Sequence, residues 1–363
     1  MSDSANNPGS ERPVDLTPDV DAITPVTTIG KFKIPTDVLR AYTMVFALIA
    51  IWIYFHFSTG HIFLEARNFS NLMRQTSVTG VLAVGMLMVI VTAQIDLSVG
   101  SLVGLAGGIA AIAQGWWGYG LVPSLAAGVA IAIAIGSIQG TLTAYLNIPA
   151  FIVTLGGLLA WRGVILGISR GETIPLRLQS FKAIGQNYVD PRAGWIMAAL
   201  GIAAVVWMML ARNRARRRHG LEPASFASTV LRIALPSAVI LWFIYTMNTY
   251  EGVPIPVIIL IAIALGGAFL TQNTTFGRYL YAIGGNPDAA RLSGIRVRQH
   301  ILLVFCLMGA LAAVSGIIAA GILQLRLAFI EPMLVPLDHP RQHQHRGPEG
   351  LCPQGVARHR RSI

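Results

Sequence analysis

The stretch VLAVGMLMVIVTAQIDLSVGSLVGLAGGIAAIAQG, residues 81 to 115, decides the fold of this protein. It consists of two apolar runs, and a short segment, QIDLSVGS at 94–101, separates them. The hydrocarbon core of a bilayer is about 30 Å thick and needs about 20 apolar residues per helix. The whole chain of 363 residues is 54% hydrophobic and only 12% charged, whereas soluble domains carry about 25% charged residues. The sequence therefore indicates a protein that is embedded in lipid.

Apolar runs of similar length recur along the chain and predict an all-α polytopic membrane protein with nine transmembrane helices. The predicted spans lie near 41–57, 77–95, 99–115, 121–145, 150–169, 194–211, 230–247, 254–270 and 300–323. The segment 61–76 has helical periodicity but carries Glu65, Arg67 and Arg74. We therefore expect it to form an interfacial helix rather than a span.

The basic residues indicate the orientation, because cytoplasmic loops carry an excess of Lys and Arg. RNRARRR, 212–218, holds five arginines, Lys31 and Lys33 precede the first span, and four arginines lie in 271–299. Six predicted spans separate the N-terminus from 212, and two separate 218 from 271. Both numbers are even, so all three basic segments fall on one side, and the N-terminus is expected in the cytoplasm. This bias accounts for the net charge of +11 without nucleic-acid binding.

The longest segment expected on the outside is 170–193, RGETIPLRLQSFKAIGQNYVDPRA. Its mixed charges and prolines suit a docking or gating surface. They are equally typical of a solvated connector, and the sequence leaves both interpretations open.

Asp96 is the only acidic residue between Glu65 and Glu172, and it stands between two apolar runs. A charge inside a membrane costs about 2.5–3.5 kcal/mol on insertion scales, so such a residue usually has a role or a partner. Asp96 either lies on a translocation pathway or at a hinge between spans, or else Asp96 or Ser98 caps the next helix. Arg162 lies within another apolar run and also needs a partner, for which Asp96 is one option.

Gly100, Gly104 and Gly108 follow the polar segment at four-residue spacing. A stripe of small residues lets helix backbones approach closely in lipid, so we expect tight packing of this helix. Trp116 and Trp161 are rings that can stack on a sugar, although Trp116 is better explained as an anchor at the membrane interface.

The stretch GGNPDAARLSGI, 284–295, has the composition of a short, capped helix between apolar runs. Asn286 can cap the first turn, Pro287 suits the first helical position, and Asp288 complements the helix dipole. Gly294 can take the left-handed conformation that ends a helix. The predicted orientation places this helix in the cytoplasm, either as a contact for a partner or as a solvated connector.

The sequence contains no constellation for catalysis. No Gly-rich phosphate loop ends in Lys-Ser or Lys-Thr, so ATP is not bound by that route, and no helix carries a two-His metal motif. The tract HPRQHQHR, 339–346, is His-rich, and such tracts can bind metal. We expect no catalytic residue and no directly bound cofactor or metal, with a metal-sensing tail as the alternative.

Three separated motifs resemble one transporter family. RNFSNLMRQTSVTGVLAVGMLMVIVTAQIDLSVGSLVGLAGG (67–108), IPAFIVTLGGLLAWRGV (148–164) and FGRYLYAIGGNPDAARLSGI (276–295) are similar to segments of the permease subunits of bacterial monosaccharide ABC importers. The likeness runs from about 61 to 330 and is greatest to the xylose-transporting members of that group.

The resemblance implies a homodimer with about ten spans per subunit in the bacterial inner membrane. Its implied partners are an ABC ATPase subunit, which uses ATP, and a periplasmic sugar-binding protein. The resemblance also implies that the cytoplasmic helix couples ATP hydrolysis to transport. The implied coupling residues are Asn286, Pro287, Asp288, Ala289, Ala290, Arg291, Leu292, Ser293 and Gly294. The rivals are a proton-driven secondary transporter with Asp96 and Arg162 as its relay, and a remnant that does not transport.

The chain is thus expected to have three parts: a disordered cytoplasmic leader, 1–40, a transmembrane permease domain, 41–330, and an atypical tail, 331–363. The tail is rich in Arg, His, Pro and Gln and has no apolar run long enough for a span. Such a composition is typical of an out-of-frame reading of GC-rich coding DNA. Our hypothesis from the sequence is a truncated or frameshifted permease, whose lost helices would leave backbone groups unpaired against lipid.

Overall fold

A computed structural model describes residues 26–29, 32–218, 220 and 225–323 of the chain. The long helices are α1 (Thr36–Ser58), α2 (Ala66–Val91), α3 (Val99–Gly115), α4 (Leu121–Ala144), α5 (Ala150–Ser169), α7 (Pro191–Arg218), α8 (Phe226–Asn248), α9 (Ile255–Asn273) and α12 (Val297–Leu323). The shorter elements are the 3-10 helix η2 (Ile62–Leu64), α6 (Gln179–Gln186), α10 (Thr275–Gly285), α11 (Pro287–Leu292), β1 (Val26–Ile29), β2 (Phe32–Pro35), β3 (Tyr188–Val189) and β4 (Val253–Pro254). The tail, 331–363, with its His-rich tract lies outside the described residues, as does most of the leader.

The all-α polytopic class is confirmed, because an apolar helix occupies the position of each predicted span. Seven helices in the described part of the chain are long and apolar enough to cross a bilayer. The other two expected spans fall on shorter apolar helices, Thr43–Ser58 within α1 and all of α3. With 17 residues, α3 is only about 25 Å long, which is less than the thickness of the hydrocarbon core.

The last part of the expected leader, residues 26–40, contains a hairpin and the start of the first helix. β1 and β2 pair as an antiparallel hairpin, with Val26 opposite Pro35, and α1 begins at Thr36 instead of near 41. The hairpin strands VTTI and FKIP are rich in β-branched and aromatic residues, which favour extended backbone.

The expected interfacial helix at 61–76 is wrong, because residues from Ala66 onward form the first turns of the transmembrane helix α2. A partner of Arg74 explains why a charge is accommodated there. Its guanidinium donates a hydrogen bond to the hydroxyl of Tyr188 at 2.9 Å and lies 5.6 Å from the centre of that ring. The guanidinium of Arg74 is therefore held by Tyr188 of β3, within the continuous helix α2.

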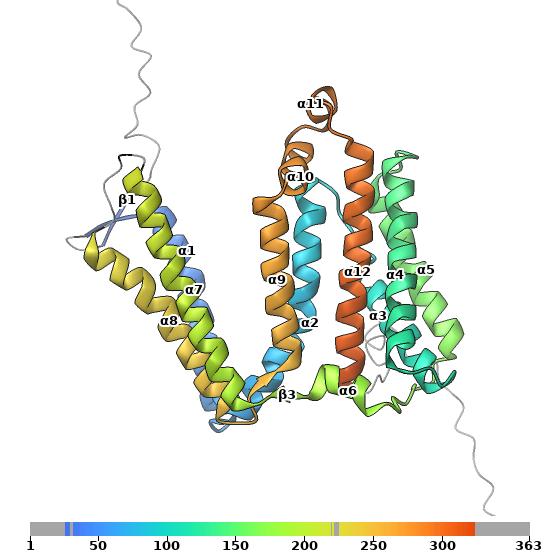
Figure 1. The fold of residues 1–363 in the computed structure, drawn as a ribbon, viewed down its shortest axis with the longest axis horizontal. Coiled ribbons are helices and arrows are strands. Elements are labelled where there is room, and N and C mark those ends of the chain that lie inside the picture. The colour runs from blue at the N-terminus through green and yellow to red at the C-terminus, as the bar shows by residue number, and fades with distance from the viewer. Residues whose placement is uncertain (1–25, 30–31, 219, 221–224, 324–363) are drawn as a thin grey trace, which may run out of the picture.

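The helices form two groups, which Figure 1 shows side by side. One group contains α1, α7 and α8, and the larger bundle contains α2 to α5, α9 and α12. The groups meet at the lower end of the view, where β3 pairs with β4. The aromatic ring of Phe69 joins them, since its centre lies 6.4 Å from that of Trp52 on α1 and 5.4 Å from that of Trp242 on α8.

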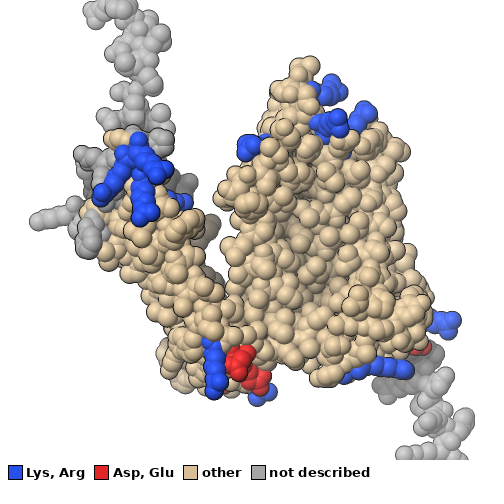
Figure 2. Space-filling view, in the orientation of Figure 1, with Lys and Arg blue, Asp and Glu red and all other residues tan. Residues whose placement is uncertain are grey.

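The predicted orientation agrees with the arrangement of the helices. The basic end of α7, the start of α1 and the α10–α11 region all lie at the upper end in Figure 1. In Figure 2, Lys and Arg side chains gather at this same end on both groups of helices. The segment before α3 descends from that end, so this segment and the short α3 together complete one crossing. The number of crossings between the basic segments therefore stays even, as predicted.

Close backbone contacts pack the larger bundle, but mostly through glycines other than the expected stripe. A Cβ on Gly100 or Gly104 would meet no atom within 4 Å, whereas one on Gly108 would reach the side chain of Ile165. A Cβ on Gly107 would lie 2.5 Å from the carbonyl oxygen of Gly316 on α12. The expected tight stripe is therefore wrong for Gly100 and Gly104. The close contact with α12 is made by Gly107, which lies on a neighbouring face of α3.

The outside segment 170–193 folds back onto the larger bundle, so it is not simply a solvated connector. Ile174 and Phe181 are fully buried in the main apolar core, and Leu176 is nearly so. The Oε1 atom of Gln114, at the lower end of α3, accepts hydrogen bonds from the backbone N–H groups of Arg177 and Leu178, each at 3.0 Å. A gating role for this segment stays a prediction.

Candidate functional site

The first candidate site is the point where α3 begins inside the larger bundle. Residues 92–98 run from the upper end of α2 toward the middle of the bundle, and α3 starts there (Figure 1). Asp96 and Ser98 are 2% and 0% exposed, so these two polar residues at the start of α3 are buried, whereas Ile95 and Leu97 before and between them are exposed. Irregular backbone at membrane depth is tolerated where protein groups satisfy it, and discontinuous helices of transporters commonly adjoin the transported solute.

Polar side chains from three elements hold this irregular segment. The Oδ1 atom of Asp96 accepts hydrogen bonds from the backbone N–H of Ser98 at 2.8 Å and from the Ser98 hydroxyl at 2.7 Å. The amide of Gln139 on α4 donates to the Ser98 hydroxyl at 2.8 Å. Thr154 on α5 donates to the carbonyl oxygen of Ile95 at 3.2 Å.

Two buried polar atoms beside Ser98 have no hydrogen-bond partner in the described structure: Oε1 of Gln139 and the indole Nε1 of Trp161. Gly157 of α5 leaves room for both side chains, because a Cβ at this position would collide with the Gln139 side chain and crowd that of Trp161. Its nearest neighbours would be the Gln139 amide nitrogen, the Trp161 Nε1 at 2.9 Å and the Ser98 Cβ at 3.3 Å. A buried acceptor and a buried donor without protein partners suit a hydroxyl group, which can bond to both.

The structure brings Asp96 and Ser98 together, as the sequence suggested, but it changes their roles. Ser98 is the N-cap residue of α3 and makes no side-chain capping bond, so the capping alternative is wrong for Ser98, whereas Asp96 accepts the backbone N–H of Ser98 at the helix start. Its hydroxyl is instead shared between Asp96 and Gln139. Arg162 is half-buried and follows Trp161 on α5. A role of these residues on the pathway or at a hinge stays a prediction.

Sequence reasoning missed Gln139 and Thr154 as members of this site. The signal was present, because each is an uncharged polar residue within a long apolar run. However, the runs 121–144 and 150–169 contain several such residues, and only the tertiary structure selects the ones that face α3.

The second candidate site is α11, which forms the uppermost point of the larger bundle in Figure 1. Oδ1 of Asn286 accepts hydrogen bonds from the backbone N–H groups of Asp288 and Ala289, each at 3.0 Å, and Pro287 occupies the first turn. Gly294 has a φ of +84°, so it takes the expected left-handed conformation after the helix. The predicted capped helix is therefore confirmed, with Ser293 as its C-cap residue.

α11 exposes charged and apolar groups next to each other. Asp288 and Arg291 form an ion pair at 3.5 Å, and their side chains are 85% and 72% exposed. Leu292 is 87% exposed, whereas Ala290 is buried against the rest of the protein. One side of α11 is therefore anchored, and the other presents a mixed surface of the kind that protein partners contact.

A packed route connects α11 to the start of α3. A Cβ on Gly284, at the end of α10, would collide with the carbonyl oxygen of Val91 at the end of α2. Leu280 of α10 is fully buried in one apolar cluster with Val89 of α2 and Val99 of α3. A displacement of the α10–α11 unit would therefore act directly on the ends of α2 and α3, which flank Asp96.

The described residues contain no group of three or more His, Cys, Asp or Glu side chains that could hold a metal ion. The His-rich tract at 339–346 lies outside them. The expectation of a protein without a bound metal or cofactor is therefore left as a prediction.

Residues 68–331 match the model of the family described as "Branched-chain amino acid transport system / permease component". The chain is 42% identical over 290 residues to the xylose transport system permease protein XylH of Haemophilus influenzae, covering 80% of this chain and 77% of that protein. It is 44% identical over 284 residues to XylH of Escherichia coli K12, covering 78% of this chain and 72% of that protein. The ribose import permease protein RbsC of E. coli K12 is 32% identical over 270 residues, covering 74% and 65%. No solved structure gives a significant match.

Proposed function

We propose a sugar-importing function for this chain, which belongs to the family described as the permease component of branched-chain amino acid transport systems. The chain is the transmembrane permease subunit of an ATP-binding-cassette importer in the bacterial inner membrane. Its substrate is a monosaccharide, D-xylose. Its working partners are a second copy of the chain, an ABC ATPase subunit and a periplasmic sugar-binding protein.

The observation that carries this proposal is the graded identity to named permeases. Identity is 42–44% to two xylose permeases over about four fifths of the chain, and it falls to 32% for a ribose permease. The matched region includes α2 to α12, so it contains both candidate sites. The sugar assignment follows the higher identity, and the importer class is common to both groups of relatives.

The geometry of α11 supports coupling to an ATPase. The helix lies at the end with the basic clusters, which the positive-inside trend assigns to the cytoplasm. Its exposed residues Asp288, Arg291 and Leu292 are available to a partner, while Ala290 and the packing of α10 fix its base. ATP is bound and hydrolysed by the partner, and the movement passes through α10 to the ends of α2 and α3.

The outer face of α5 supports a second copy as a partner. Gly156, Ala160, Gly163 and Gly167 recur at spacings of three or four residues on this helix, and all four are exposed. A Cβ on any of the three glycines would meet no atom within 4 Å. Small residues in this arrangement allow close approach of another helix in lipid, so this face suits the homodimer interface.

The proposal is tested by reconstituting the permease with its ATPase into proteoliposomes and adding sugar-loaded binding protein. We expect xylose uptake that requires ATP hydrolysis and continues when an uncoupler removes the proton gradient. Ribose is expected to compete poorly.

Uptake that needs no ATPase and collapses with the uncoupler would establish the proton-driven rival instead. A permease that binds both partners but carries no sugar would support the non-transporting remnant. The coupling step is tested by Arg291→Glu, which reverses a charge on α11 and is expected to abolish co-purification of the ATPase.

A further inference from the structure

The end of α7 carries a concentration of positive charge that the proposed transport cycle does not use. Arg212, Arg214, Arg216, Arg217 and Arg218 lie in its last two turns, and all five are exposed. α7 and α8 contain no Asp or Glu within 191–218 and 225–248. None of the five arginines forms an ion pair with another residue that the structure describes.

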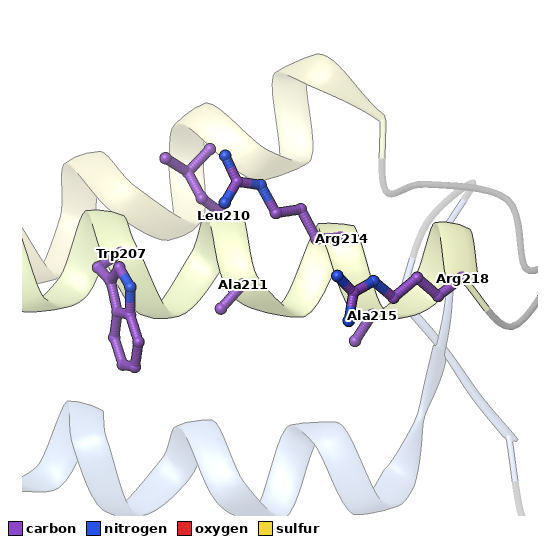
Figure 3. Close-up of a pocket in the computed structure, with 6 residues that line it drawn as sticks. All are labelled: Trp207, Leu210, Ala211, Arg214, Ala215 and Arg218. Carbon is purple, nitrogen blue, oxygen red and sulfur yellow. The ribbon is translucent and has the colours of Figure 1, made fainter.

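A groove of about 460 Å³ lies along one face of this helix end. Trp207, Leu210, Ala211, Arg214, Ala215 and Arg218, all from α7, line it, and Figure 3 shows Trp207 extending toward α1 while Leu210 and Arg214 project from the opposite side of the helix. A second groove of about 280 Å³ on the neighbouring face brings Arg232 of α8 close to Arg212 and Arg216. Positive charge therefore surrounds the end of α7, and the first groove adds an apolar floor.

The groove has two chemically different ends. Trp207 is 73% exposed and Leu210 is 48% exposed, and such large apolar surfaces favour contact with hydrocarbon rather than water. Arg214 lies seven residues further along the helix, which corresponds to a rise of about 10 Å toward the basic end. An occupant that matches both ends must be an amphiphile, with an anionic head and an apolar tail.

The position along the membrane normal points to the same occupant. α7 has 28 residues and is about 42 Å long, so it exceeds the hydrocarbon core and reaches through the headgroup layer. Trp is enriched at the boundary of the acyl chains, and basic pockets between transmembrane helices on the cytoplasmic side bind acidic lipid headgroups. A soluble phosphate would satisfy the arginines but would leave Trp207 and Leu210 uncovered.

We propose that this groove along the end of α7 binds an anionic phospholipid of the cytoplasmic leaflet. The phosphate lies between the guanidinium groups of Arg214 and Arg218, where Arg can donate bidentate hydrogen bonds to it. An acyl chain covers Trp207 and Leu210. The lipid thereby fixes the α1–α7–α8 group, which lies beside the larger bundle and joins it at the end far from this site.

The test is native mass spectrometry of the detergent-solubilised full-length permease titrated with phosphatidylglycerol or with zwitterionic phosphatidylcholine. The double variant Arg214→Gln/Arg218→Gln removes two charges from the groove. The double variant Arg296→Gln/Arg298→Gln is the matched control, because it removes two exposed arginines from the same membrane face beside α12. Thermal unfolding of each variant, measured in detergent, verifies that the fold is retained.

We expect the groove variant to weaken phosphatidylglycerol binding about 30-fold. Each arginine near the membrane surface strengthens binding of an acidic lipid about fivefold, and the variant removes two of them. The control variant should keep its affinity, and Trp207→Ala should weaken binding of both lipids. Equal losses in the two double variants would overturn the proposal in favour of diffuse charge attraction. Displacement of the lipid by inorganic phosphate alone would overturn it in favour of a soluble-anion site.

Discussion

Replacing Asn286 by Ala removes the cap of α11 and tests whether this helix is the contact for the ATPase. The Asn286 side chain accepts the hydrogen bonds of two backbone N–H groups at 3.0 Å, and Ala cannot replace them. Losing such a cap costs about 1 kcal/mol, within a range of about 0.5–2 kcal/mol. Because α11 has only six residues, it lies far below the length at which a helix is stable by itself.

The expected effect on partner binding follows from this cost. A loss of about 1 kcal/mol lowers the ratio of folded to unfolded α11 about fivefold, since about 1.4 kcal/mol corresponds to tenfold. The apparent dissociation constant for a partner that needs the folded helix is inversely proportional to the folded fraction of α11, so it rises by the full fivefold when the free helix is mostly unfolded. We therefore expect the ATPase to bind up to about fivefold more weakly, and ATP-driven sugar uptake to fall accordingly.

The assay is binding of the purified ATPase subunit to immobilised permease, followed by uptake in proteoliposomes. Asn286→Asp should restore binding, because a carboxylate accepts the same two hydrogen bonds and complements the helix dipole. Asn273→Ala is the matched control, since Asn273 is an exposed residue at the same end of the bundle and its side chain makes no hydrogen bond to the described part of the chain. Unchanged binding by Asn286→Ala, or an equal loss in Asn273→Ala, would refute the reasoning.

Two further predictions concern the interior of the bundle. Asp96→Asn keeps an oxygen that accepts from the Ser98 N–H and hydroxyl, so sugar uptake should stay within about twofold of wild type, whereas Asp96→Ala should lose most of it. Abolished uptake in Asp96→Asn would instead indicate a proton relay. Gly107→Ala places a Cβ 2.5 Å from the Gly316 carbonyl oxygen and should destabilise the protein by about 1–3 kcal/mol in thermal unfolding. Gly104→Ala meets no atom within 4 Å and should be neutral or slightly stabilising; equal effects of the two glycine variants would contradict this packing.

The sequence alone determined the features that depend on local chemistry. The apolar runs are long enough to specify transmembrane helices, and nine helices occupy the predicted positions. Basic residues fixed the common end of α1, α7 and α11, because the cost of moving charge across a membrane acts on each loop separately. The capped helix was also predictable, since Asn286, Pro287 and Gly294 act only on their own neighbours.

Only the tertiary structure decided how these helices share the interior of the membrane. Hydropathy reports how many apolar residues occur in a row and not the depth at which a helix begins, so the start of α3 beside Asp96 was not predictable. The pairing of Gly107 with Gly316, the contact of Gln139 with Ser98 and the partner of Arg74 all join residues far apart in the chain. Such contacts depend on the relative rotation of the helices about their axes, and the many small residues in these spans permit several rotations that only packing of the complete bundle distinguishes.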